Sequence, residues 1–132
     1  MAKSKREEIR VAGLNEPLSH YTDAVRFGDL LFVSGVAPLD GAGRVVGGND
    51  AAAQTRQVFL NMKQILNAGG CDFKDVLKVT VYLTDVNDRA RINPVRKEFF
   101  GAHRPASTLI GIREFAVPGM LIEIEAVAGI PG

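Results

Sequence analysis

The chain has 132 residues, of which 46% are hydrophobic and 23% are charged, and these proportions exclude a disordered chain and predict one globular domain with a single core. A formal net charge of +1 provides no general attraction to a polyanion, so no nucleic-acid partner is expected. No apolar run reaches membrane-spanning length, and the basic N-terminus has no apolar segment behind it, so we expect no membrane contact and a cytoplasmic location.

A β-hairpin is the first element that the sequence predicts. Two short apolar-rich runs, at residues 24–27 and 30–34, are separated by Gly28 and Asp29. A two-residue loop that begins with glycine is typical of a type II′ turn, so the two strands should pair antiparallel. Turn residues follow on both sides of a candidate short strand at residues 44–46.

A long helix comes next. Asp50 is suited to the N-cap, and Gly69 with Gly70 should end the helix after about residue 68. Between these signals, apolar residues recur at helical spacing and should face the core: Val58, Met62, Ile65 and Leu66.

A regularly alternating strand and a second helix follow. The apolar residues of the strand, which should all lie on its covered face, are Leu77, Val79, Val81 and Leu83. The second helix is expected to begin at Pro94 with Asn93 as its N-cap, because proline fits the first helical position, and to end at Gly101. A short turn from Asp88 should precede it.

Two last strands, near residues 108–112 and 121–128, complete the predicted fold. The resulting order of elements indicates an α+β domain in which one sheet carries both helices on the same face. The other face then exposes apolar strand residues to water, and self-association is the simplest way to cover them.

The last strand carries the most informative pattern for chemistry. Strict alternation puts Glu123 and Glu125 on one face, between Leu121 and Val127. A carboxylate beside aliphatic neighbours loses hydration, so it must be paired, have a raised pKa, or face a cleft where an acid/base group is useful. The alternative is an edge strand whose two acids are solvated.

Several classes of catalytic site are not supported by the sequence. His20 and His103 are far apart in the sequence, and Cys71 is the only cysteine, so the sequence has no recognisable metal-binding motif and no metal is expected. No P-loop precedes a helix, and no nucleophile elbow is present. The remaining candidates are carboxylates, hydroxyls and amides.

Five ordered segments carry a resemblance to a known family. They are residues 21–25 (YTDAV), 31–39 (LFVSGVAPL), 53–58 (AQTRQV), 76–83 (VLKVTVYL) and 122–126 (IEIEA). Together they resemble the Rid family of enamine and imine deaminases, also called the YjgF family, over roughly residues 17–128. The resemblance implies a chorismate-mutase-like fold with a single mixed sheet, in which residues 1–16 form a lead-in strand and loop. It also implies a homotrimer with active sites between subunits.

The resemblance further implies a reaction and its residues. The reaction is the hydrolysis of a reactive enamine or imine acid to a carbonyl compound, with release of ammonia and without a cofactor. By position, the family's catalytic acid falls on Glu123 and its active-site tyrosine on Tyr21, although the usual Gly-Pro before that tyrosine is Ser-His here. Ser34 and Asn93 match the family's serine and helix asparagine. Simpler roles stay open: a buried tyrosine with a satisfied hydroxyl, a serine that bonds backbone, and an asparagine that caps its helix.

The main departure from the family is its substrate-binding arginine, whose place is taken by Ser107. Without that charge-assisted bond, worth about 1.5 to 3 kcal/mol, a simple 2-imino acid should bind roughly ten- to a hundredfold more weakly unless another cation compensates. Candidate cations are Arg104, Arg113 and Arg26.

This departure favours a specialised substrate, such as the 2-aminomuconate-type enamines of aromatic breakdown that some relatives deaminate. The alternatives are a 2-iminobutanoate/2-iminopropanoate deaminase and a non-catalytic trimer that binds ligands or acts like a chaperone. Ribonuclease activity, a further property of some relatives, is disfavoured by the near-neutral charge.

Overall fold

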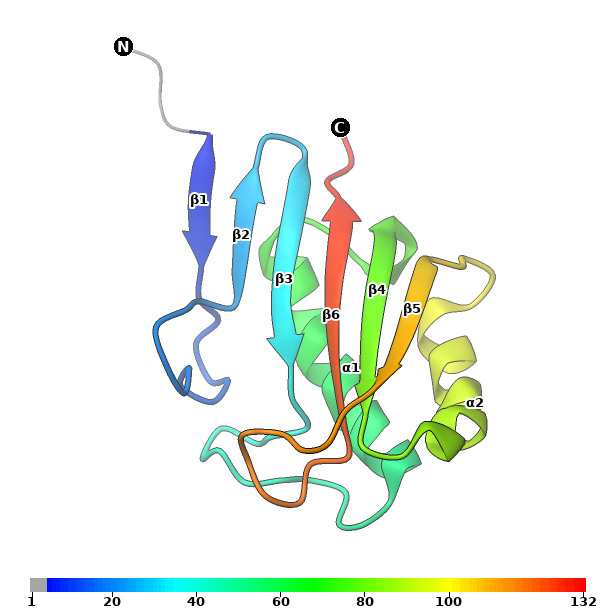
Figure 1. The fold of residues 1–132 in the computed structure, drawn as a ribbon. Helices are drawn as coiled ribbons and strands as arrows, with labels where there is room; N and C mark the ends of the chain where they lie inside the picture. The colour runs from blue at the N-terminus through cyan, green and yellow to red at the C-terminus, as the bar shows by residue number, and fades with distance from the viewer. Residues whose placement is uncertain (1–4) are drawn as a thin grey trace.

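One mixed sheet organises the computed structural model, which describes residues 5–132 (Figure 1). Its six strands are β1 (Arg6–Ile9), β2 (Ala24–Phe27), β3 (Leu30–Val36), β4 (Val76–Leu83), β5 (Ala106–Gly111) and β6 (Ile122–Gly129). They lie in the order β1-β2-β3-β6-β4-β5, and every neighbouring pair is antiparallel except β4 and β5. The helices α1 (Ala51–Ala68) and α2 (Arg89–Phe100) pack on one face, and short 3-10 turns η1 (Phe73–Asp75) and η2 (Val86–Asp88) precede β4 and α2. The predicted α+β fold is therefore confirmed.

The hairpin of β2 and β3 forms as the sequence predicts. Phe27 pairs with Leu30 across the turn, and Gly28 has a φ of 60°. A positive φ at the first loop position is what a type II′ turn requires, and glycine adopts it without steric cost.

Helix α1 also has the predicted ends. The Asp50 carboxylate accepts hydrogen bonds from the backbone N–H groups of Ala52 and Ala53, at 2.9 and 3.4 Å. Gly69 caps the other end, and Gly70 follows with a φ of 83°. The predicted core-facing stripe is confirmed, because Val58, Met62, Ile65 and Leu66 are all buried.

The predicted start of the second helix is wrong. Helix α2 begins at Arg89, so Pro94 lies inside it and Asn93 is a helical residue rather than the N-cap. The ring of proline fixes a helical φ, and the main loss is one hydrogen bond to the carbonyl of the residue four positions earlier. Ile92 and Val95, which flank the proline, are both buried, and their burial stabilises the turn that the proline weakens.

Two strand predictions also need correction. Leu77 is 52% exposed instead of buried, because a register shift between Val76 and Lys78 interrupts the alternation of β4. The candidate strand at residues 44–46 is reduced to a single bridge between Leu39 and Val45.

The core lies between the helices and one face of the sheet, and β6 sits at its centre. Ile122, Ile124, Ala126 and Ala128 of β6 are buried there. The alternate residues of β6 therefore point to the opposite face, which neither helix covers (Figure 1). Cross-strand register places large exposed apolar side chains on this open face: Phe27, Leu30, Phe32 and Ile110.

Gln54 joins helix α1 to the segment that leads into β6. Its side chain is fully buried, and its amide nitrogen donates to the carbonyls of Gly48 and Gly119, at 2.8 and 2.9 Å. Its amide oxygen accepts from the backbone N–H of Leu121 at 2.8 Å. One side chain thus satisfies three backbone groups, two of them next to β6.

Replacing this amide tests its structural importance. We expect Gln54→Ala to lower the free energy of unfolding by about 3 kcal/mol, because it leaves buried backbone groups without partners. Chemical denaturation measures the change, with Gln64→Ala as control, since Gln64 is exposed on the same helix. Equal losses in the two variants would contradict the assignment.

Candidate functional site

A cavity of about 60 Å³ lies where β3 ends and β6 begins, under the loop that precedes β2. Tyr21, Asp23, Ser34, Gly35 and Glu123 are among its lining residues. The structure therefore brings together three of the predicted site residues, Tyr21, Ser34 and Glu123, from segments far apart in the chain.

The carboxyl group of Glu123 lies directly against Gly35. A Cβ atom at position 35 would sit 2.7 Å from Oε2 of Glu123, so any larger residue there would displace the carboxyl group from this position. The bare backbone of Gly35 thus allows the close approach. The contact half-buries Glu123, and this desolvation raises the pKa of its carboxyl group, with a smaller contribution from the nearby charge of Glu125.

Glu125 is in a different state, although it lies on the same face of β6. Its carboxylate accepts a short hydrogen bond from the hydroxyl of Tyr82 on β4. This hydrogen bond is also the main reason that the pKa of Tyr82 is raised. Within the described part of the chain, no side chain or backbone group donates a hydrogen bond to the carboxyl group of Glu123. Glu123 is therefore the acid whose oxygens remain available to a water molecule or a substrate.

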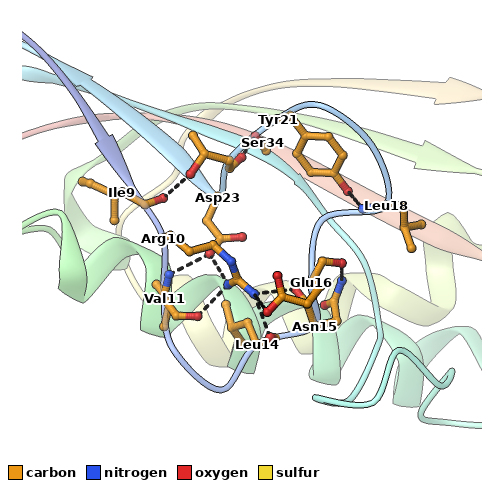
Figure 2. Close-up of polar contacts among 11 residues, drawn as sticks. Ile9, Arg10, Val11, Leu14, Asn15, Glu16, Leu18, Tyr21, Asp23 and Ser34 are labelled. Atoms are coloured by element: carbon orange, nitrogen blue, oxygen red, sulfur yellow. Dashed lines mark hydrogen bonds and ion pairs between the residues drawn. The ribbon is translucent and has the colours of Figure 1, made fainter.

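Tyr21 lies at the mouth of the cavity rather than in the core. Its side chain is 47% exposed, and its hydroxyl accepts a hydrogen bond from the backbone N–H of Leu18 at 3.2 Å (Figure 2). The alternative of a buried tyrosine is therefore wrong. The hydroxyl proton is not used by this contact, so it can be donated to a ligand.

Ser34 makes the backbone contact that its simpler role predicts. Its hydroxyl donates to the carbonyl of Thr22 at 2.6 Å. Ser34 also lines the cavity, and the lone pairs of its hydroxyl oxygen are not used by this contact, so they can accept a hydrogen bond.

An ion pair that the sequence analysis missed holds the loop over the cavity. Arg10 donates to Asp23 at 2.7 Å and to the carbonyls of Val11, Leu14 and Asn15, at 2.6 to 3.0 Å (Figure 2). Asp23 also accepts from the backbone N–H of Val11 at 2.8 Å. No periodicity pointed to this pair, because the two residues are 13 positions apart and meet only when the loop closes.

The other predicted site residues do not reach this cavity. Asn93 and Arg104 line a second hollow of about 290 Å³, between the C-terminal half of α2 and the loop before β5. Ser107 lies next to this hollow, where its hydroxyl accepts a hydrogen bond from Arg96 at 3.1 Å. Arg96, which also lines the hollow, is a cation that the sequence analysis did not consider.

Two candidate cations lie outside both hollows. Arg26 pairs with the buried Leu31, so it is on the helix-bearing side of the sheet, opposite Glu123, and its Nε donates to the carbonyl of Gly28 at 3.3 Å. Arg113 is exposed in the loop between β5 and β6.

Residues 5–132 carry neither a metal-binding cluster nor a membrane-spanning helix. No group of three or more histidine, cysteine, aspartate or glutamate side chains is placed to hold a metal ion. None of the helices combines the length and apolarity needed to cross a bilayer. Cys71 is buried, and this burial raises the pKa of its thiol, which disfavours the reactive thiolate.

Comparison with known proteins gives consistent matches along almost the whole chain. A family model described as endoribonuclease L-PSP matches residues 13–130. A RutC family protein of Pyrococcus horikoshii is 42% identical, over 93% of this chain and 97% of the relative. The 3-aminoacrylate deaminase RutC of Acinetobacter baylyi is 38% identical, over 95% and 98%. The human 2-iminobutanoate/2-iminopropanoate deaminase is 36% identical, over 97% and 93%.

Solved structures share the fold. The yeast protein YEO7 has a TM-score of 0.90 at 27% identity, with 96% of this chain and 99% of that chain covered. TdcF of E. coli, solved with bound serine, has a TM-score of 0.84 at 31% identity, with 93% and 98% covered.

The raised pKa of Glu123 predicts a specific dependence of stability on pH. For a carboxyl group whose pKa is higher in the folded than in the unfolded protein, ionisation costs stability as the pH rises from the unfolded value, about 4.3, through the folded one. Glu123→Gln removes this cost, so the variant should exceed the parent in free energy of unfolding at pH 7. The difference should shrink as the pH falls toward about 4.3.

Denaturation at a series of pH values measures this difference. Glu114→Gln is a matched control, because Glu114 is exposed and lies outside the cavity. A difference between the Glu123→Gln variant and the parent that does not change with pH would contradict the assignment.

Proposed function

Because the chain belongs to the endoribonuclease L-PSP family, which is the Rid family that its sequence resembles, we propose that it hydrolyses a reactive enamine or imine acid to the carbonyl compound and ammonia. The observation that carries this proposal is the half-buried carboxyl group of Glu123, which has no hydrogen-bond donor of its own and lies in a cavity that Tyr21 and Ser34 also line. The names of two relatives, an aminoacrylate deaminase and an iminobutanoate deaminase, support the same reaction class.

Glu123 is suited to the proton transfers of this reaction. Its raised pKa increases the protonated fraction over that of a solvated glutamate, and the protonated form can donate a proton to the enamine carbon and leave an iminium ion. The resulting carboxylate then accepts a proton from the water that adds to the iminium carbon. The carboxyl group then gives this proton to the nitrogen, the C–N bond breaks with release of ammonia, and the hydroxyl proton of the adduct passes to the carboxylate as the carbonyl compound forms. A cavity of about 60 Å³ has room for the attacking water.

The substrate within this class is a finer proposal. We propose a conjugated, 2-aminomuconate-type enamine acid, because Ser107 stands where the family has its substrate-binding arginine. Such an acid has two carboxylates, so the protein can bind it through contacts that differ from those of a short imino acid. The alternative is the 2-iminobutanoate or 2-iminopropanoate substrate for which the human relative is named.

We also propose that the protein works as a homotrimer with sites between subunits. Two observations support this assembly. The open face of the sheet exposes Phe27, Leu30, Phe32 and Ile110, which need cover from water. In addition, Asn93, Arg104 and Ser107 lie away from the Glu123 cavity of their own chain, so a second copy is needed to bring them to it.

The assembly can be tested by placing a charge on the open face. Phe32→Asp should shift the protein from trimer to monomer in sedimentation at micromolar concentration, because a carboxylate cannot be buried there without a partner. Leu60→Asp is the matched control, since Leu60 is equally exposed on α1, away from the open face: 46% against 47% for Phe32. A parent protein that sediments as a monomer would rule out the intersubunit site.

The reaction can be tested by removing the acid. Glu123→Gln should reduce ammonia release from 2-iminobutanoate, generated in situ, by about a hundredfold or more, the usual scale for a general acid/base. Glu125→Gln should stay within about fivefold of the parent, because Glu125 is held by Tyr82 and is not the free acid. Substrate decay in buffer is subtracted, and the oligomeric state of each variant is checked.

Parallel assays separate the other candidate functions. If the Glu123→Gln variant releases ammonia as fast as the parent, the mechanism is wrong and a ligand-binding role is favoured. Cleavage of RNA by the parent at the same salt concentration, without ammonia release, would instead support the endoribonuclease activity for which the family is named.

A further inference from the structure

Arg96 is a partly buried cation without an anionic partner. It lies on the C-terminal half of α2, and its only described hydrogen bond is the one that Nη2 donates to the hydroxyl of Ser107. No carboxylate of the described chain pairs with it, whereas Arg56, Arg91 and Lys63 form ion pairs with acidic side chains on the same side of the molecule. Burial lowers the pKa of Arg96, which shows that the surroundings give its charge little compensation.

The position of Ser107 explains why Arg96 reaches this point. Ser107 pairs with Val79 across the parallel β4–β5 ladder, and Val79 is buried under the helices. Paired residues in a sheet project to the same face, so Ser107 points toward α2 and meets the guanidinium group there. The hydroxyl occupies one of the five donors of the guanidinium group, and the others remain for a ligand.

The hollow next to Arg96 has a strongly one-sided charge. Lys97 and Arg104 line it together with Arg96, the other polar lining residues are Asn93 and His103, and no acidic residue is among the lining residues. Like charges that gather without a counter-charge repel one another, so an anion that enters this hollow is stabilised by all of them.

We propose that this hollow is an anion-binding site in which Arg96 holds a small organic carboxylate. The planar guanidinium group presents two parallel N–H donors that match the two oxygens of a carboxylate. A volume of about 290 Å³ is enough for an acid of a few carbon atoms, with the amide of Asn93 available for a second polar group.

The identity of the ligand rests on the proposed function. If the protein hydrolyses enamine or imine acids, the carboxylate is that of the substrate, and Arg96 performs the role for which Arg104, Arg113 and Arg26 were the candidates from sequence. Because the hollow and the Glu123 cavity are separate in one chain, the arginine would serve the acid of a neighbouring copy.

Binding of an unreactive acid tests the site without turnover. The ligand is 2-oxobutanoate, the carbonyl product expected from 2-iminobutanoate, and calorimetry measures its Kd for the assembled protein. Arg96→Ala should weaken binding by roughly ten- to a hundredfold, and Arg96→Lys should give a smaller loss because it keeps the charge without the fork. Arg89→Ala removes the same charge from an exposed position of α2 outside the hollow and should stay within about twofold.

Kinetics provide the second measurement. Arg96→Ala should raise KM for the imino acid by the same factor, while kcat changes by about threefold or less, because the carboxylate is bound equally in the ground and transition states. Sedimentation and thermal unfolding confirm that each variant is folded and assembled, and the Arg96→Lys result decides the case if Arg96→Ala does not fold.

Each outcome has a clear meaning. The proposal is overturned if the parent does not bind 2-oxobutanoate, if Arg96→Ala binds it as well as Arg89→Ala does, or if inorganic phosphate binds more tightly than the carboxylate. If binding depends on Arg96 but no enamine releases ammonia, the anion site is supported and the proposed function is wrong. If ammonia is released and KM is unchanged in Arg96→Ala, the proposed function is supported and the anion site is wrong.

Discussion

The contact between the Glu123 carboxyl group and the bare backbone of Gly35 is the constraint on which the candidate site depends. The two residues come from β6 and β3, which are neighbours in the sheet, and Gly35 lies where the register between these strands shifts. The irregularity and the missing Cβ together open a space beside β6, and the glutamate fills part of it. In this position the carboxyl group is half-buried, and this burial, with the charge of Glu125, raises its pKa, as acid/base chemistry requires.

Glu123 and Glu125 lie on the same face of β6, but their surroundings give them different roles. Glu125 is satisfied by the phenol of Tyr82, and its carboxylate ties β6 to β4. Glu123 has no such partner and faces the loop that Arg10 and Asp23 hold closed. The charge of Glu125 strengthens its hydrogen bond to Tyr82, and the same charge makes Glu123 harder to ionise.

Local signals in the sequence were sufficient for much of the fold. The glycine of the hairpin, the aspartate and glycines that bound α1, and the alternation of β6 each act over a few residues, and the structure confirms all three. Pro94 was misplaced because its fixed φ suits a helix interior as well as a helix start, and only burial of its neighbours decides between them. Leu77 was misplaced because a bulge has no clear signature in an alternating pattern.

The site was predictable only in part. Glu123 was indicated by its unusual place on an apolar strand, and Tyr21 and Ser34 by resemblance, and the fold gathers the three around one cavity. Arg10, Asp23 and Arg96 carried no signal, because each depends on a contact between segments that only the folded chain brings together. Their roles, and those of Asn93, Ser107 and Arg104, stay predictions.

The strand order has a consequence for how the molecule is made. β6 lies between β3 and β4 in space but follows every other strand in the chain, so a nascent polypeptide holds β1-β2-β3 and β4-β5 as two unjoined pieces until residues 122–129 have been synthesised. At about 5 to 20 residues per second, each piece exposes an unpaired edge for seconds, and such edges invite pairing with other chains. The strand that carries Glu123 is thus also the strand that joins the two halves of the sheet. Neither the complete sheet nor the Glu123 cavity can form before the ribosome has synthesised it.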